Sequence, residues 1–193
     1  MTDLADRRGV ETEVYQPAED SHLLAEAAVE DLRADPPGLA LEVGTGSGYV
    51  AERVADETGA RVVGSDVNPH ACEQARDRGV EAVRADLLEP FRTESFDAVL
   101  FNAPYLPTEP DEERDDWMEV ALSGGEDGRA VVEPFLETVG RVLAPDGAVY
   151  LLVSSLTGVE EVVAMAETEG FSAVALRDES FPFETLTVLK LVR

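Results

Sequence analysis

The chain alternates short apolar runs with segments of helical periodicity. The first segment, Glu19 to Leu32, places apolar residues three and four positions apart, which predicts a helix that ends before Pro36. The next apolar run, Leu39 to Val43, leads into a glycine-rich turn and then into a second helical pattern. This order of strand, turn and helix predicts a βα unit.

The same alternation continues through the rest of the sequence. Further strands are expected at residues 62–66, 80–84, 96–101, 148–153, 172–177 and 186–192, and further helices at 69–78, 130–143 and 159–169. The fourth strand is strongly apolar and is expected at the centre of the sheet, whereas the last two can pair as an antiparallel hairpin. The pattern predicts an α/β fold with parallel βαβ units, helices on both faces, and a ligand site at the carboxyl ends of the strands.

No linker, repeat or low-complexity tract interrupts this pattern, so we predict a single domain over residues 1–193, with an N-terminal helical segment at about 15–35. Between about 105 and 128 the chain has several prolines, a Gly-Gly pair and no sustained periodicity, which predicts a loop or lid facing the substrate. Within it, the run Asp111 to Asp116 is interpreted as solvated surface, and Trp117 as either a substrate contact or a buried anchor.

Composition narrows the class of protein. Of the 193 residues, 44% are hydrophobic, about 85 side chains, which suffices for one α/β core. Acidic residues number 41 against 15 basic ones, giving a net charge of −26, and Lys190 is the only lysine. Such a surface repels a nucleic-acid backbone. It is typical of halophilic proteins, which work where molar salt screens self-repulsion; a generally acidic protein is the alternative.

Neither a membrane segment nor a metal centre is expected. No stretch approaches 18 consecutive apolar residues, and Met1 to Gly9 is charged, so we predict a soluble, cytoplasmic protein. Cys72 is the only cysteine, which excludes an intramolecular disulfide and a cysteine-based zinc site within the chain. His22 and His70 lie far apart and lack metal-ligand spacing.

The first candidate for chemistry is the turn Gly44, Thr45, Gly46 between a strand and a helix, preceded by Glu42. Glycines let the backbone approach a ligand, and the helix start supplies free N–H groups. The turn alone fits either a dinucleotide pyrophosphate or a tight βα connection. Glu42 disfavours a pyrophosphate and suits the cationic amino group of a methionine moiety, unless it merely caps the strand.

Two further acids follow the next two strands. Asp66 lies about twenty residues after the glycines, where a carboxylate can accept both ribose hydroxyls of NAD or of S-adenosylmethionine. Asp86 can accept the adenine amino group, and Leu87 can offer its backbone N–H. Acids are abundant here, so any single one can be surface decoration. Together with the glycine turn, the three acids favour S-adenosylmethionine, with S-adenosylhomocysteine as the product.

The most specific feature is Asn102, Ala103, Pro104, Tyr105, directly after the fourth strand. The Asn102 side-chain oxygen and the Ala103 carbonyl are two acceptors that suit an NH₂ group, and Pro104 stiffens the turn. An amide or nucleobase nitrogen is planar and weakly nucleophilic, so two acceptors orient its hydrogens and leave its lone pair facing a methyl group. Tyr105 can stack on the same planar group. The alternative is an ordinary β-turn.

These motifs resemble the HemK-type glutamine N5-methyltransferases, whose Asn-Pro-Pro-Tyr sequence is NAPY here. The segment Val14 to Ser21, VYQPAEDS, resembles the opening of their archaeal and eukaryotic branch. The resemblance implies a class I methyltransferase fold, a three-layer Rossmann-like sheet of seven strands, mostly parallel with an antiparallel C-terminal strand. It implies S-adenosylmethionine-dependent methylation of the Gly-Gly-Gln glutamine of a translation release factor. Ala103 replaces a proline, but the inferred role uses its backbone carbonyl.

The resemblance also implies the site and a partner. It places Asn102 near the transferred methyl, and the residues implied to line the cofactor site are Ser21, Glu42, Gly44, Asp66, Asp86 and Leu87. Transfer would be direct and in line, without a protein nucleophile or a metal, relying on orientation and exclusion of water. A small zinc-binding activator subunit would pair with the strand Val80 to Arg84, which this fold places at a sheet edge.

Two other classes of function remain open. One is an N6-adenine methyltransferase, because the exocyclic NH₂ of adenine could bind the NAPY turn as an amide NH₂ does. Such an enzyme needs a basic groove and a target-recognition region, and the net charge of −26 weighs against both. A non-catalytic cofactor-binding scaffold would act through its edge strand, and the intact NAPY weighs against it. Lysine or small-molecule substrates also remain open.

Overall fold

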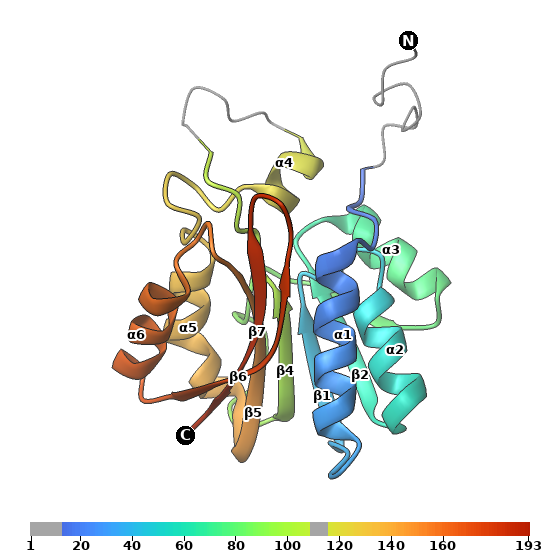
Figure 1. Cartoon of the computed structure of the whole chain (residues 1–193). Coiled ribbons are helices and arrows are strands. Elements are labelled where there is room, and N and C mark those ends of the chain that lie inside the picture. The colour runs from blue at the N-terminus through green and yellow to red at the C-terminus, as the bar shows by residue number, and fades with distance from the viewer. Residues whose placement is uncertain (1–12, 109–115) are drawn as a thin grey trace.

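The computed structural model describes residues 13–108 and 116–193, so Met1 to Gly9 and all of the acidic run except Asp116 lie outside the described residues. The strands are β1 (Leu39–Val43), β2 (Arg61–Asp66), β3 (Glu81–Arg84), β4 (Phe96–Asn102), β5 (Leu143–Ser154), β6 (Ser172–Ser180) and β7 (Thr185–Val192). They form one sheet in the order β3-β2-β1-β4-β5-β7-β6 (Figure 1). The predicted central position of β4 is confirmed.

Strand direction also agrees with the sequence pattern. β1 pairs in parallel with β2 and β4, as do β2 with β3 and β4 with β5. β7 is antiparallel to both β5 and β6. The predicted class, a mostly parallel seven-stranded sheet with an antiparallel C-terminal strand, is confirmed.

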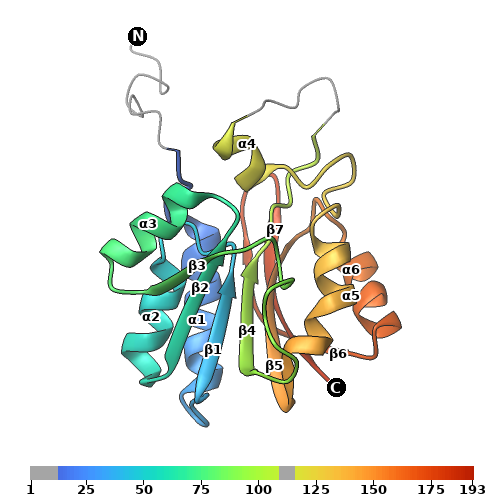
Figure 2. The ribbon, with the colours of Figure 1, turned by 180° about the vertical axis from the view of Figure 1, so that it is seen from behind.

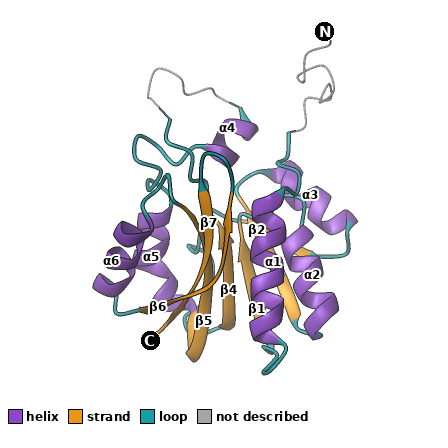
Figure 3. Cartoon of the chain, in the orientation of Figure 1, coloured by secondary structure: helices purple, strands orange, loops and turns teal. Residues whose placement is uncertain are grey.

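Helices cover both faces of the sheet. They are α1 (Glu19–Leu32), α2 (Tyr49–Thr58), α3 (Pro69–Asp77), α4 (Trp117–Leu122), α5 (Val132–Val142) and α6 (Val159–Thr168). In β4, Ala98 and Leu100 pack in the cluster with α1 and α2, whereas Val99 and Phe101 pack in the cluster with α5 and α6. Successive side chains of a strand point to opposite faces, so one apolar run supplies two cores. Figures 2 and 3 show the resulting three layers.

The elements begin and end where local chemistry permits. The Asn68 side chain caps α3 by accepting a hydrogen bond from the N–H of His70 (2.9 Å), and Pro69 occupies the first helical position. Gly48 and Gly59, with φ of 82° and 76°, bracket α2.

Two predictions of secondary structure were wrong. The segment expected to be loop contains α4, whose first turn is capped by Asp116 accepting from the N–H of Glu119 (2.8 Å). Residues 144–147, which lie between the expected helix at 130–143 and the expected strand at 148–153, are part of β5. Phe96 pairs with Leu143 and Ala98 with Ala148, so the extra residues form an irregularity in the ladder. A bulge of this kind lets a strand continue through a turn sequence.

The lone lysine joins three elements across the sheet. Lys190 Nζ in β7 donates to Asp31 Oδ2 in α1 (2.7 Å), and the buried Tyr150 in β5 donates its hydroxyl to the same oxygen (2.6 Å). Partial burial by itself would raise the pKa of Asp31, but the hydrogen bonds from Lys190 and Tyr150 outweigh it and lower that pKa. The contact fixes α1 on the sheet.

Within the described ranges, no helix is long and apolar enough to span a bilayer.

Candidate active site

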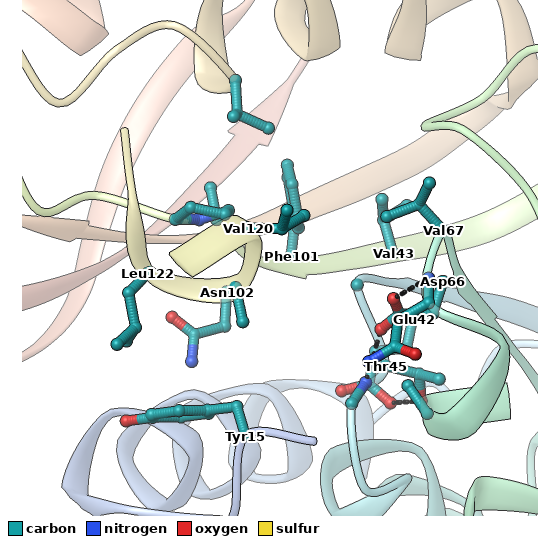
Figure 4. Close-up of a pocket in the computed structure, with 18 of the residues that line it drawn as sticks. Tyr15, Glu42, Val43, Thr45, Asp66, Val67, Phe101, Asn102, Val120 and Leu122 are labelled. Atoms are coloured by element: carbon teal, nitrogen blue, oxygen red, sulfur yellow. Dashed lines mark hydrogen bonds between the residues drawn. The ribbon is translucent and has the colours of Figure 1, made fainter. Parts of the chain in front are cut away.

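A cavity of about 470 Å³ opens at the carboxyl ends of β1, β2 and β4, the position at which open α/β sheets bind ligands. Its size lies within the range of small-molecule sites. It is lined by the glycine turn after β1, the ends of β2 and β4, residues 85–87, α4, and five residues before and within α1, which are Val14, Tyr15, Pro17, Asp20 and Ser21. Figure 4 shows the two sides of this cavity, with Glu42 and Asp66 on one and Asn102 on the other.

The glycine turn brings backbone to the cavity wall. Gly44 has a φ of +61°, and a Cβ there would lie 3.3 Å from the Phe101 ring, so the close approach of β1 and β4 favours glycine. Thr45 N donates to the Ser65 carbonyl (2.8 Å), which holds the turn against β2. The predicted turn residues Gly44, Thr45 and Gly46 all line the cavity.

Glu42 is buried at the base of the cavity, with 3% of its surface exposed. Its Oε2 accepts hydrogen bonds from the Thr45 hydroxyl (2.5 Å) and the Ala51 N–H (3.0 Å), whereas Oε1 has no partner among the described residues. Burial, reinforced by the charge of Asp66, raises the pKa of Glu42 to about 8, although both hydrogen bonds oppose the shift. A cationic ligand group would favour the charged form.

Asp66 lies at the end of β2 with both oxygens oriented by backbone. Oδ2 accepts from the Gly46 N–H and Oδ1 from the Asn68 N–H, each at 2.9 Å. Burial raises the pKa of Asp66, and these backbone donors oppose the rise. Asp86 also lines the cavity but is exposed, and its neighbour Leu87 is half-buried with a φ of 44°.

Asn102 presents an unsatisfied acceptor at the end of β4. Its Oδ1 is buried and has no hydrogen-bond partner within the described residues, and it belongs to the cavity lining. An unpaired buried carbonyl costs free energy, which a donor supplied by a ligand would recover. Ala103, Pro104 and Tyr105 also line the cavity. Burial, then nearby carboxylates, with Asp20 first, raises the pKa of Tyr105 above its ordinary value.

Tyr15 and Asp20 extend the site beyond the residues chosen from the sequence. The Tyr15 hydroxyl donates to Asp20 Oδ2 (3.1 Å), and Asp20 Oδ1 accepts from the N–H (2.6 Å) and hydroxyl (3.2 Å) of Ser21. Figure 4 shows the Tyr15 ring facing Asn102 across the cavity. The VYQPAEDS segment contained both residues, but only Ser21 received a role, because the pattern does not reveal that Asp20 is buried.

The short helix α4 forms the outer wall. Trp117, Val120, Ala121 and Leu122 line the cavity, and Trp117 is half-buried there, so it is accessible from the site rather than an anchor in the core. Leu106 N donates to the Leu122 carbonyl (3.0 Å), tying α4 to the chain just after Tyr105.

Comparison with known proteins identifies the family. A profile described as a methyltransferase domain matches residues 40–124. A putative protein N5-glutamine methyltransferase of Methanocaldococcus jannaschii is 36% identical over 187 residues, which cover 94% of this chain and 92% of that protein. This chain belongs to the HemK-type protein glutamine methyltransferases. Human methyltransferase HEMK2 is also 36% identical to this HemK-type chain, over 96% of it and 92% of the human protein.

The fold of this HemK-type chain is also found in a solved complex. The structure of the E. cuniculi Mtq2–Trm112 complex, described as responsible for methylating the termination factor eRF1, matches with a TM-score of 0.79 and 31% identity. The match covers 94% of this chain and 99% of the other. The chain is therefore an enzyme of the methyltransferase class with the class I fold.

The donor set of the site suits an organic cofactor. Within the part of the chain that the structure describes, no group of three or more His, Cys, Asp or Glu could hold a metal ion. The cavity combines glycine backbone, the free Glu42 Oε1 and two carboxylates after successive strands. These groups complement the amino, ribose and adenine groups of S-adenosylmethionine.

Proposed function

We propose that this chain transfers a methyl group from S-adenosylmethionine to the side-chain nitrogen of the Gly-Gly-Gln glutamine in an archaeal/eukaryotic-type release factor. Asn102 is the observation that carries the proposal, because this residue lines the cavity and its buried oxygen, which has no partner among the described residues, matches an amide NH₂. The family and the names of its relatives support the glutamine as acceptor.

The cofactor would lie along the β1 and β2 ends of the cavity. Glu42 would accept from its ammonium group through Oε1, Asp66 from its ribose hydroxyls, and Asp86 from its adenine amino group. Bound there, the cofactor supplies an electrophilic methyl on a sulfonium. The remaining residues, which are Ser21, Gly44, Thr45, Gly46 and Leu87, would complete the lining of the site.

The acceptor amide would lie against the NAPY turn. Asn102 Oδ1 and the Ala103 carbonyl accept its two hydrogens, so the nitrogen lone pair faces the methyl, and Pro104 holds both acceptors in place. Tyr105 stacks on the planar amide. As the nitrogen–carbon bond forms, the sulfur–methyl bond would break with its electron pair left on sulfur, giving S-adenosylhomocysteine, and the methylated nitrogen would then release a proton to solvent. Catalysis then rests on orientation and exclusion of water, which need no protein base.

We also infer that the edge of the sheet binds a small zinc-binding activator subunit. β3 is a four-residue edge strand, which leaves backbone groups free to pair with another chain. Val83 in β3 is 41% exposed. An open depression beside it is lined by apolar residues, among them Leu39, Val63, Phe91 and Phe96, and by the charged residues Arg61, Arg76 and Glu81. The similar Mtq2 was solved in complex with Trm112.

The test combines activity with mapping of the product. The purified chain, with and without the activator subunit, is incubated at high salt with S-adenosylmethionine and the release factor, and methylation is located by peptide mass spectrometry. High salt suits the charge of −26, which we interpret as adaptation to a saline cytoplasm.

We expect one methyl group on the Gly-Gly-Gln glutamine. A release factor with that glutamine changed to alanine serves as the control substrate and should remain unmodified. Absence of protein methylation despite measured cofactor binding would overturn the release-factor assignment.

A further inference from the structure

Some of the exposed apolar side chains lie in the cavity lining or at the same end of the sheet as the cavity. The large apolar residues exposed among those that the structure describes are Val67, Val83, Val120, Leu156, Val174 and Phe183. Val67 and Val120 line the cavity itself. Leu156 follows β5, and Phe183 forms the turn between β6 and β7, which Figure 1 shows at the same end of the sheet as α4. Phe183 stands out at 93% exposed, against 55% for Val174.

Hydrogen bonds fix the β6–β7 turn to the segment after β5. Ser155 N donates to the Thr185 carbonyl (2.8 Å), and Thr185 N donates to the Ser155 hydroxyl (3.0 Å). The buried Ser154 donates its hydroxyl to Glu184 Oε2 (2.6 Å). Phe183 therefore projects from a turn whose base is held on both sides, which reduces the entropy lost when its ring is immobilised.

The same segment reaches the proposed reaction site. Thr157 donates its hydroxyl to the carbonyl of Tyr105 (3.4 Å), the last residue of the NAPY turn. Phe181, at the base of the β6–β7 turn, packs against the same core cluster as Tyr105. A continuous set of contacts thus leads from Asn102 and Tyr105 to the turn that carries Phe183.

A glutamine side chain is short, so the substrate polypeptide that carries it must pass close to the mouth of the cavity. When its amide lies against Asn102, its backbone remains at the mouth, and the rest of the polypeptide must continue over the surrounding residues. A phenylalanine exposed there is unfavourable in the free enzyme and becomes favourable when a partner covers it.

We propose that Phe183 is a docking residue that binds an apolar surface of the folded release factor beside its glutamine loop. This inference rests on the proposed function, and it adds a specificity contact outside the cavity. Glu184 beside Phe183 disfavours an anionic lipid surface or nucleic acid as the occupant. An apolar contact also keeps its strength in concentrated salt, where steering between exposed charges is screened.

Phe183→Ala tests the proposal in the complex with the activator subunit. We expect the KM for the intact release factor to rise about tenfold, with kcat at saturation and cofactor affinity unchanged, because truncation of an interface anchor weakens binding only. A short peptide carrying the Gly-Gly-Gln loop does not extend to Phe183, so its KM should stay constant. Phe183→Leu should restore most of the affinity.

Val174→Ala is the matched control, since it removes an exposed apolar side chain from the β6 edge. It should leave the KM for the release factor unchanged. An equal KM for Phe183→Ala and the wild type would overturn the inference, as would an equal loss with peptide and protein or a weaker affinity for the cofactor.

A binding measurement separates this inference from the proposed function. The Kd of the release factor is compared for the wild type and Phe183→Ala without turnover. If no methyl transfer occurs but Phe183→Ala binds the release factor more weakly than the wild type does, the proposed function is wrong and the docking role of Phe183 is supported. If methylation proceeds and Kd is the same for both, the docking inference alone fails.

Discussion

The two sides of the cavity differ in how completely their polar groups are satisfied. On the β1–β2 side, Glu42 Oε2 and both oxygens of Asp66 already accept hydrogen bonds from the chain itself, and of these two carboxylates only Glu42 Oε1 has no partner among the described residues. On the β4 side, the Asn102 oxygen is buried without a partner. The first side is preorganised for a ligand, whereas the second is completed only by one.

This difference assigns cofactor binding to one side of the cavity and methyl transfer to the other. Carboxylates held by backbone N–H groups keep their orientation in the free enzyme, so little order is lost when a cofactor arrives. An unsatisfied acceptor holds its substrate without first breaking an internal hydrogen bond. Changes on the β1–β2 side should therefore alter cofactor affinity, and changes at β4 should alter methyl transfer.

The largest effect is expected at Asn102. Asn102→Ala should lower the single-turnover rate of glutamine methylation about a thousandfold, because the amide loses the acceptor that orients it. Cofactor affinity, measured by calorimetry, should change less than threefold. If affinity and rate fell together by similar factors, the two sides of the cavity would not be separable.

The pH dependence of stability sharpens the contrast on the Glu42 side. Burial raises the pKa of Glu42 to about 8, from an ordinary value of 4.5, so the folded cofactor-free protein keeps a proton that the unfolded chain releases. Its contribution to the free energy of unfolding is full below pH 4.5 and falls by several kcal/mol as pH rises toward 8.

Denaturant titrations of the wild type and Glu42→Gln at constant high salt measure this contribution. The glutamine variant cannot ionise, so the difference between the two curves should shrink or reverse as pH rises through that window. Parallel curves for the two proteins would show that Glu42 does not retain its proton on folding.

A smaller effect is expected at Asp66. Asp66→Asn should weaken cofactor binding about thirtyfold, because a neutral amide accepts weaker hydrogen bonds from the ligand hydroxyls than a carboxylate does. The amide also has one acceptor oxygen in place of two, so one of the two backbone N–H donors loses its partner. Calorimetry gives the affinity, and single-turnover assays at saturating cofactor should show a rate near that of the wild type. A rate that stays a thousandfold low at saturation would assign Asp66 to chemistry.

The smallest effect is expected at Asp86, which lines the same side but is exposed. Asp86→Asn should weaken cofactor binding only about threefold, because water competes for exposed hydrogen bonds. The contrast between Asp66→Asn and Asp86→Asn tests whether burial sets the strength of the carboxylate contact. Equal losses of affinity in the two variants would contradict that explanation.

The sequence predicted the sheet well because its pattern is local. Strands such as β1 and β4 are apolar runs bounded by turns, and their alternation with helices permits few topologies. The helix α4 was missed because six residues give less than two turns of periodicity. Asp116 and Glu119, three residues apart, were a capping signal that could have located its start.

The candidate site was predictable where residues follow strands directly. Asp66 and Asn102 are the last residues of their strands, and Glu42 is the last but one of β1. The parallel topology alone therefore brings all three to one edge of the sheet. The Tyr15–Asp20 contact was not predictable, because it depends on how the segment before α1 folds back over the cavity. The same holds for the turn that carries Phe183, because a hairpin near the end of the chain bonds to Ser155, two residues before Thr157, which bonds to the NAPY turn.

Lys190 makes the chain simple to label. An amine-reactive reagent has this one side chain as its target, together with the amino terminus. Because the Lys190 ammonium donates to Asp31, acylation must compete with the contact that joins α1 to β7. The rate of modification at this single amine therefore reports how often the contact between Lys190 and Asp31 opens, without any engineered probe.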